Sequence, residues 1–276
     1  MTNSKQLSIM SRGETMIFEG RAAIGVAGIV FALVFAVRIY TAKKGYYVPK
    51  LRRLPAVDAI DEAIGRATEM GRPVHQALSY QSITQSAANA MLLAAISVSR
   101  YIARKTAELG TDLIVTVGAS ETYTVAEEVV RTAYLEAGKP EAYDPTSMVR
   151  FLSPAQFAYT TATMGIMNRE KIAANIMIGY FAAESLILAE TGHSIGAIQI
   201  AGTSVMPQIP FFVVTCDYSL IGEEVYAVSA YLDDDLEIKS TNAAQDLAKA
   251  IAGLLILLGS LSLTFGSSWL VDLLGK

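Results

Sequence analysis

Two long uncharged apolar runs are the feature that most constrains how this chain can fold. Residues 22–37 read AAIGVAGIVFALVFAV, and residues 251–271 read IAGLLILLGSLSLTFGSSWLV. A helix that spans a bilayer needs about 20 predominantly apolar residues. The second run has this length, and the first reaches it with the two residues beyond Arg38, whose charge can snorkel to the membrane surface. The sequence therefore predicts two transmembrane helices, one over residues 21–40 and one that continues a helix within residues 242–276.

A third apolar stretch, AANIMIGYFAAESLILAETG (residues 173–192), has the length of a span but carries Glu184 and Glu190. Each carboxylate would cost several kcal/mol at the centre of a bilayer. Its first half is typical of a buried strand and its second half of a helix, with Gly192 as the expected cap. We therefore assign this stretch to a folded domain outside the membrane and predict two spans.

Short apolar runs alternate with helical segments between the two predicted spans. The predicted strands are residues 73–80, 112–117, 148–152, 174–181, 197–202 and 211–216. Ser/Thr-x-x-Glu/Gln spacing, as in residues 82–85 and 124–127, predicts helix starts, and glycines predict helix ends. Strands that alternate with helices and are apolar throughout indicate a parallel sheet covered on both faces. The predicted fold class is α/β, with a doubly wound, mostly parallel sheet of about six strands over residues 41–241.

Positive charge is concentrated on the side that follows the first span. That side carries Arg38, Lys43, Lys44, Lys50, Arg52 and Arg53, whereas the polar segment of residues 1–20 and its junction with the span carry Lys5, Arg12 and Arg21. Positively charged residues near spans remain on the cytoplasmic side. The sequence thus predicts a two-pass protein of the cell membrane, with its main domain in the cytoplasm.

The composition and the missing motifs narrow the classes of function. A chain with 52% hydrophobic and 17% charged residues fits a few spans joined to one folded domain. The net charge of −4 offers no basic surface for nucleic acid. One cysteine and two histidines leave little material for a metal site. The sequence has no phosphate loop, no dinucleotide fingerprint and no nucleophile elbow, so we predict no cofactor and no catalytic residue, and the question of an enzyme stays open.

Polar side chains at the carboxyl ends of the predicted strands form a candidate pocket, because ligands of doubly wound sheets bind beyond these ends. The candidates are Ser120, Glu121, Glu184, Thr203 and Asp217. An alternative is that the serine and aspartate cap helices and that the glutamates are first-turn charges favoured by the helix dipole.

Small residues recur at four-residue spacing in both predicted spans. The first span has Gly28, Ala32 and Ala36 on one face, and the second has Ser262 and Gly266. Such stripes allow helices in a membrane to approach closely. They fit contacts between copies of the chain and, equally, packing of the two spans of one chain against each other.

Five segments of the chain are distinctive: EAIGRATEMGRPV (62–74), YLEAGKPEAYDP (134–145), VRFLSPAQFAY (149–159), REKIAANIMIGYFAAESLILAETG (169–192) and IGAIQIAGTSVMPQIPFFVVTCDYSLIGEE (195–224). These segments resemble a family of bacterial and archaeal membrane proteins known only as a domain of unknown function. The resemblance covers roughly residues 55–232 and implies a membrane-anchored α/β architecture. It implies no activity.

Two functions of different classes follow from these features. The first is a membrane-anchored structural or assembly protein that forms a homo-oligomer in the lipid bilayer and carries a cytoplasmic α/β domain. The alternative is a sensor or enzyme that binds a small-molecule ligand in the strand-end pocket. A fold of this kind can host either function, so the fold alone does not decide between them.

Overall fold

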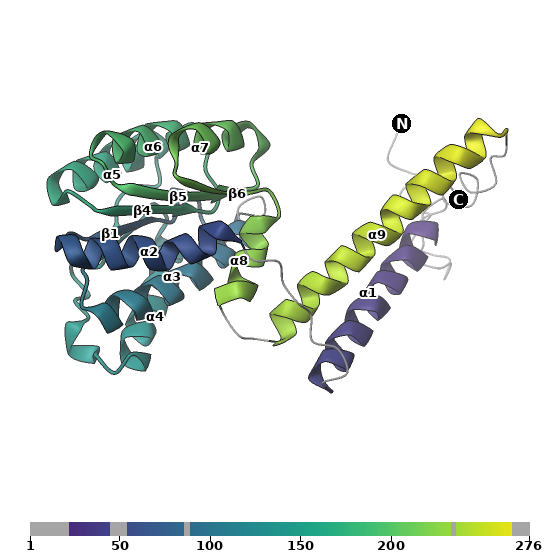
Figure 1. The fold of residues 1–276 in the computed structure, drawn as a ribbon, viewed down its shortest axis with the longest axis horizontal. Coiled ribbons are helices and arrows are strands. Elements are labelled where there is room, and N and C mark those ends of the chain that lie inside the picture. Colours follow the sequence, from purple (N-terminus) through teal and green to yellow (C-terminus); the bar gives the residue numbers. More distant parts are fainter. Residues whose placement is uncertain (1–21, 45–53, 86–88, 233–235, 267–276) are drawn as a thin grey trace, which may run out of the picture. The chain divides into compact units, whose positions relative to one another are not determined.

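The computed structural model describes residues 22–44, 54–85, 89–232 and 236–266. Contacts within the chain divide it into two units, one formed by Met1–Lys50 with Leu236–Lys276 and the other by Leu51–Asp235. The second unit contains the sheet, and the first contains two long helices (Figure 1). Each unit is described separately below.

Six parallel strands form one sheet in the order β3-β2-β1-β4-β5-β6. The strands are β1 (Val74–Ala77), β2 (Leu113–Val117), β3 (Val149–Phe151), β4 (Ala174–Ile178), β5 (Ile198–Thr203) and β6 (Tyr218–Ile221). The chain winds outwards from β1 to β3, crosses back beside β1, and winds outwards again to β6. This is the order of a doubly wound dinucleotide-binding sheet, and its switch point lies between β1 and β4. The predicted α/β class and strand number are therefore confirmed.

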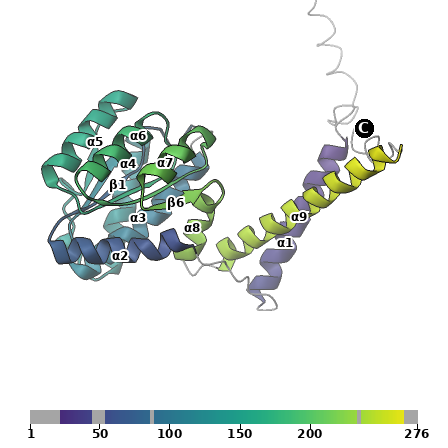
Figure 2. The ribbon, with the colours of Figure 1, turned by 45° about the horizontal axis from the view of Figure 1, so that its top comes forward.

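Helices cover both faces of this sheet (Figures 1 and 2). One layer holds α2 (Pro55–Met70), α3 (Asn89–Leu109), α4 (Ser120–Glu136) and α8 (Glu224–Leu232). The opposite layer holds α5 (Gln156–Glu170), α6 (Glu184–Ser194) and α7 (Ile209–Thr215), and two short 3₁₀ turns, Pro140–Ala142 and Met206–Gln208, complete the unit. The starts of two helices differ from those predicted. Residues 82–85 form a turn, so α3 starts later than predicted, at Asn89. In contrast, α4 starts earlier than predicted, at Ser120 rather than at Thr124.

Successive strand residues point to opposite layers, and each layer has its own apolar core. Val74, Val115 and Ile176 belong to the cluster shared with α2, α3, α4 and α8. Ala77 and Met177, at odd-numbered positions of β1 and β4, belong to the cluster shared with α5, α6 and α7. All residues of β1, β2 and β4 are buried, as expected for central strands covered on both faces.

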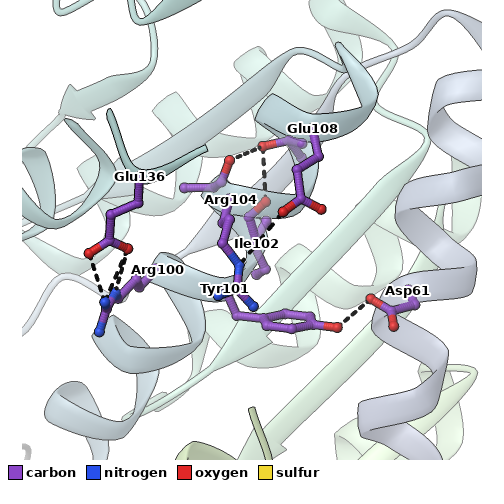
Figure 3. Close-up of polar contacts among 9 residues, drawn as sticks. Asp61, Arg100, Tyr101, Ile102, Arg104, Glu108 and Glu136 are labelled. Carbon is purple, nitrogen blue, oxygen red and sulfur yellow. Dashed lines mark hydrogen bonds and ion pairs between the residues drawn. The ribbon is translucent and has the colours of Figure 1, made fainter. Parts of the chain in front are cut away.

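Polar pairs on the surface join the helices of the first layer (Figure 3). From α3, Tyr101 donates a hydrogen bond of 2.6 Å to Asp61 of α2, and Arg100 forms a bidentate ion pair with Glu136 of α4. The guanidinium and carboxylate are 47% and 38% exposed, so solvent screens this pair. Packing of the apolar residues beneath these pairs therefore contributes most of the stability of this layer.

The sixth strand was predicted at residues 211–216, and this prediction is wrong. This segment forms α7, and β6 begins at Tyr218. Two adjacent parallel strands require a long crossover connection, so a helix must lie between β5 and β6. Pro210 occupies the first turn of α7, where proline is tolerated, and Phe212 buries its ring edge-on against Phe181 of the same layer.

In the other unit, α1 (Ala22–Lys43) packs along α9 (Leu236–Thr264). Among the described residues, one helical segment has the length and hydropathy of a membrane span, Lys239–Thr264. The described residues thus contain one such segment where the sequence predicts two, and the spanning of a membrane by α1 stays a prediction. Residues 1–21 and 267–276, which include Trp269, lie outside the described residues.

Candidate functional site

A cavity of about 370 Å³ lies at the carboxyl ends of the first three strands. It is lined by Tyr80, Gln81, Ser82 and Gln85 after β1, by Ala119, Ser120 and Glu121 after β2, and by Phe151 and Pro154 at the end of β3. Polar side chains thus surround an opening at the edge of the sheet where ligands of doubly wound folds bind. Two of the five predicted pocket residues, Ser120 and Glu121, belong to it.

Glu121 is the one acidic residue of this cavity, and it is already oriented. Its Oε2 atom accepts hydrogen bonds from the hydroxyl groups of Ser82 (3.4 Å) and Ser120 (3.2 Å). A hydrogen bond from its own backbone N–H, followed by those of Ser120 and Ser82, holds the pKa of this carboxyl below its usual range. The carboxylate is therefore ionised at neutral pH, and its oxygen atoms can act only as hydrogen-bond acceptors.

Gly118 allows the three strand ends to meet closely. A Cβ atom at this position would lie 2.3 Å from Cα of Tyr80 and 2.7 Å from the carbonyl oxygen of Ser153. These contacts involve backbone atoms, which cannot rotate away. A residue with a side chain would therefore push apart the loops that form the cavity.

Glu184, at the start of α6, does not line this cavity. It is fully buried, and its Oε2 atom accepts a hydrogen bond of 2.6 Å from the amide of Gln156. Its Oε1 atom has no hydrogen-bond partner among the described residues. The carboxyl thus lies beyond β4, on the far side of the switch point from Glu121, and the structure does not bring these two candidates together.

The remaining two candidates also lie elsewhere. Thr203, at the end of β5, is buried and its hydroxyl accepts a hydrogen bond from the backbone N–H of Val205. Asp217 precedes β6 and so lies at the amino end of that strand, where its carboxylate accepts the backbone N–H of Gln199 at 2.8 Å. The structure therefore does not bring all five residues to one pocket. Glu184 and Thr203 lie beyond β4 and β5, across the switch point from the cavity, and Asp217 precedes β6, which starts seven residues later than predicted.

A row of buried polar side chains crosses the sheet beneath α5, α6 and α7. His75, Asn175 and Gln199 are aligned in register on β1, β4 and β5. The imidazole Nδ1 lies 2.8 Å from Asn175 Oδ1 and Nε2 lies 3.0 Å from the hydroxyl of Thr116, which in turn lies 3.2 Å from the hydroxyl of Tyr159. All five side chains are at most 1% exposed.

The hydrogen-bond donors fix the direction of this row. The amide nitrogen of Gln199 donates to the carbonyls of Ala189 and Thr215, so its oxygen accepts from the amide nitrogen of Asn175 at 3.1 Å. Asn175 Oδ1 then accepts from Nδ1–H of His75. The low pKa of the buried ring makes the imidazole neutral at pH 7, and in this form Nε2 accepts from the hydroxyl of Thr116. Burial lowers its pKa from 6.5 to about 4, against the opposing effect of the Asn175 hydrogen bond and with a smaller lowering effect from Arg150.

Gly192 makes room for this row rather than ending a helix. The sequence predicted a cap here, but α6 continues to Ser194, and the left-handed residue is Gly196, with a φ of 68°. A Cβ atom at Gly192 would lie 2.1 Å from Oε1 and 2.6 Å from Cδ of Gln199. The sequence alone did not predict this row, although a polar residue at the second position of β1, β4 and β5 is a signal for it.

The small-residue stripe of α1 is exposed. The less exposed residues of the described part of α1 lie mainly along one side of the helix and are Phe31, Val34, Phe35, Arg38, Ile39, Thr41 and Ala42. Gly28, Ala32 and Ala36 are exposed, and a Cβ atom at Gly28 would meet no other atom within 4 Å. In α9, Ser262 is partly buried and donates to the carbonyl of Gly259, whereas Gly266, with a φ of 78°, follows the end of the helix.

The described residues contain no group of three or more histidine, cysteine or acidic side chains arranged to hold a metal ion. Comparison with curated proteins and with solved structures finds no match. Comparison with protein families matches residues 13–274 to one family, described as a domain of unknown function, and this match includes both long helices as well as the sheet. The chain therefore belongs to the family DUF6754.

Proposed function

We propose that this protein is a membrane-anchored structural or assembly protein. In this proposal α1 and α9 both span the cell membrane, copies of the chain associate through the bilayer, and each copy carries its α/β unit in the cytoplasm. The observation that carries the proposal is the exposed stripe of Gly28, Ala32 and Ala36 on α1.

The stripe bears on the two alternatives that the sequence left open. The contact of α1 with α9 uses the face that contains Phe31, Phe35 and Ala42, so packing within one chain leaves the small residues exposed. Apolar helices in lipid have no hydrophobic drive to associate, and close van der Waals contact is a main source of attraction. A smooth stripe without a partner in its own chain therefore supports contact with a helix of a second copy.

The length of α1 supports its role as a second anchor. Its 22 residues extend about 33 Å at 1.5 Å per residue, which matches the hydrocarbon thickness of a bilayer. Its side chains include exposed Ile29, Val30, Leu33 and Val37, which suit contact with lipid. Its basic residues, Arg38 and Lys43, lie towards its carboxyl end and Lys44 follows it, which supports a cytoplasmic location of that end.

The proposed contact is tested by filling the stripe without changing its polarity. Ala32→Phe places a bulky ring on the small-residue face, whereas the control Val37→Phe places the same ring on an exposed face that points elsewhere. The mass of each purified variant in mild detergent is then measured. We expect a smaller assembly for Ala32→Phe and an unchanged one for Val37→Phe. Equal masses for Ala32→Phe and the unaltered protein would show that this face is not a subunit interface.

The proposed topology is tested by labelling in intact cells. Cys216 is replaced by alanine, and a cysteine is placed at the exposed Ala158 of α5. A membrane-impermeant thiol reagent should fail to label this variant until the cells are lysed. Labelling before lysis would place the sheet on the outer side and contradict the proposed topology.

A further inference from the structure

We propose that the cavity at the ends of β1, β2 and β3 binds a ring that carries several hydroxyl groups, such as a sugar or a cyclic polyol. This inference goes beyond the assembly function, because it assigns a ligand class to the α/β unit. It rests on the size of the cavity, on the mixture of its polar groups and on its one exposed aromatic ring.

The polar groups of the cavity both donate and accept. Glu121 accepts hydrogen bonds only, whereas the hydroxyl groups of Ser82 and Ser120 and the amides of Gln81 and Gln85 can do both. The side-chain oxygen of Gln81 is buried and has no hydrogen-bond partner among the described residues. Each ligand hydroxyl also donates and accepts, so a ligand with several hydroxyl groups can satisfy a lining of this kind.

An aromatic ring provides an apolar wall beside these groups. Phe151 is 47% exposed although it ends a strand, and its ring packs edge-on against Tyr123 at 6.4 Å between centroids. This contact leaves a fixed ring at the cavity. The C–H face of a sugar can pack on such a ring while the hydroxyl groups at its edge reach the polar groups. The volume of about 370 Å³ is near the lower end for ligand pockets and suits one ring.

The charge of the cavity argues against two other ligand classes. Among the described residues, the lining includes the carboxylate of Glu121 and no lysine or arginine, so phosphates and carboxylates would be repelled. An ammonium ion would be attracted, but it only donates hydrogen bonds and would leave the acceptor demand of the serine hydroxyls and glutamine amides unmet. A neutral hydroxylated ring fits the charge and the hydrogen-bonding pattern together.

The inference is tested with the full chain in a zwitterionic detergent, because detergents with sugar headgroups would compete for the site. Ligand-observed saturation-transfer NMR and calorimetry are used with D-ribose, D-glucose and myo-inositol, and with choline and inorganic phosphate as the opposing probes. Octyl glucoside below its micellar concentration is compared with D-glucose to separate a lipid headgroup from a free sugar. The variants are Glu121→Gln and Phe151→Ala, with Glu128→Gln as a control that removes an exposed carboxylate elsewhere on α4.

We expect at least one of the hydroxylated rings, free or as octyl glucoside, to bind. Glu121→Gln and Phe151→Ala should each weaken that binding at least tenfold, and Glu128→Gln should leave it unchanged. We expect affinities on the order of millimolar for the hydroxylated probes. Binding of choline or phosphate alone would overturn the inference. Failure of every hydroxylated probe to bind at about 10 mM, or equal binding of a probe by all three variants, would also overturn it. None of these outcomes changes the mass of the assembly, so this test and the test of the assembly function can fail independently.

Discussion

Acidification should destabilise the α/β unit through His75, and the structure sets the size of the effect. The imidazole is neutral when folded, with its pKa lowered from 6.5 to about 4 by burial between β1 and α5. In the unfolded chain it takes up a proton near pH 6.5. The contribution of neutral His75 to the free energy of unfolding is therefore fully present above pH 6.5 and decreases as the pH drops towards 4. Below pH 4 this group causes no further loss of stability. At about 1.4 kcal/mol for each pKa unit, the complete loss amounts to about 3 kcal/mol.

The window from pH 7.5 to 5.5 isolates this effect from most carboxylates. Linkage predicts a loss of about 1.3 kcal/mol across this window for a group with these two pKa values. The free energy of unfolding is measured by denaturant titration of the full chain in detergent, followed by circular dichroism. His75→Gln keeps a donor and an acceptor but cannot titrate, so its loss should be less than about 0.5 kcal/mol. The matched control His193→Gln changes the exposed histidine of α6 and should retain the loss of the unaltered protein.

Equal pH dependence of His75→Gln and the unaltered protein would refute this reasoning. If His75→Gln does not fold at any pH, the same claim is checked on the unaltered protein, in which ¹³C-labelled histidine gives two NMR signals. The signal of His75, identified as the one that remains in His193→Gln, should show no titration above pH 5. A midpoint above pH 6 for this signal would contradict a neutral buried imidazole.

Further predictions concern packing and surface contacts. Gly192→Ala should lower the free energy of unfolding by about 1–3 kcal/mol, because its Cβ would overlap the amide of Gln199, whereas Gly165→Ala, at an exposed helical position with open space, should raise it by up to about 1 kcal/mol. Denaturant titration checks both, and equal effects would contradict the packing described here. Tyr101→Phe should cost less than about 1.5 kcal/mol, since its hydrogen bond to Asp61 lies at the surface; a larger loss in the same assay would show that this contact matters more than the apolar core beneath it.

The sequence predicts five of the six strands at close to their observed positions. β2, β4 and β5 read as short apolar runs because both faces of a central parallel strand are buried. The prediction of the sixth strand is wrong because residues 211–216 are rich in β-forming residues, which favours a strand locally. The topology of the sheet instead requires a helix at this point of the chain. Only eight residues separate 202 from 211, which is too short for a crossover between adjacent parallel strands, so the connection length argues for the helix that is observed.

The candidate site was predicted in part, for related reasons. Ser120 and Glu121 directly follow β2, which was placed correctly, and they lie at the observed cavity. Asp217 was assigned to the wrong edge of the sheet, since its strand was misplaced. The buried row through His75 and Asn175 depends on the register between strands that are 100 residues apart, and a single sequence does not specify that pairing.

The mass of the unaltered protein, extracted from membranes in mild detergent and measured by native mass spectrometry, tests the central proposal most directly. One chain has a mass of 29.6 kDa. We expect a discrete assembly of two or more copies, which persists on dilution and dissociates when the small-residue stripe of α1 is filled. Recovery of the protein from the soluble fraction, or a mass of one chain in every mild detergent, would contradict membrane-anchored assembly.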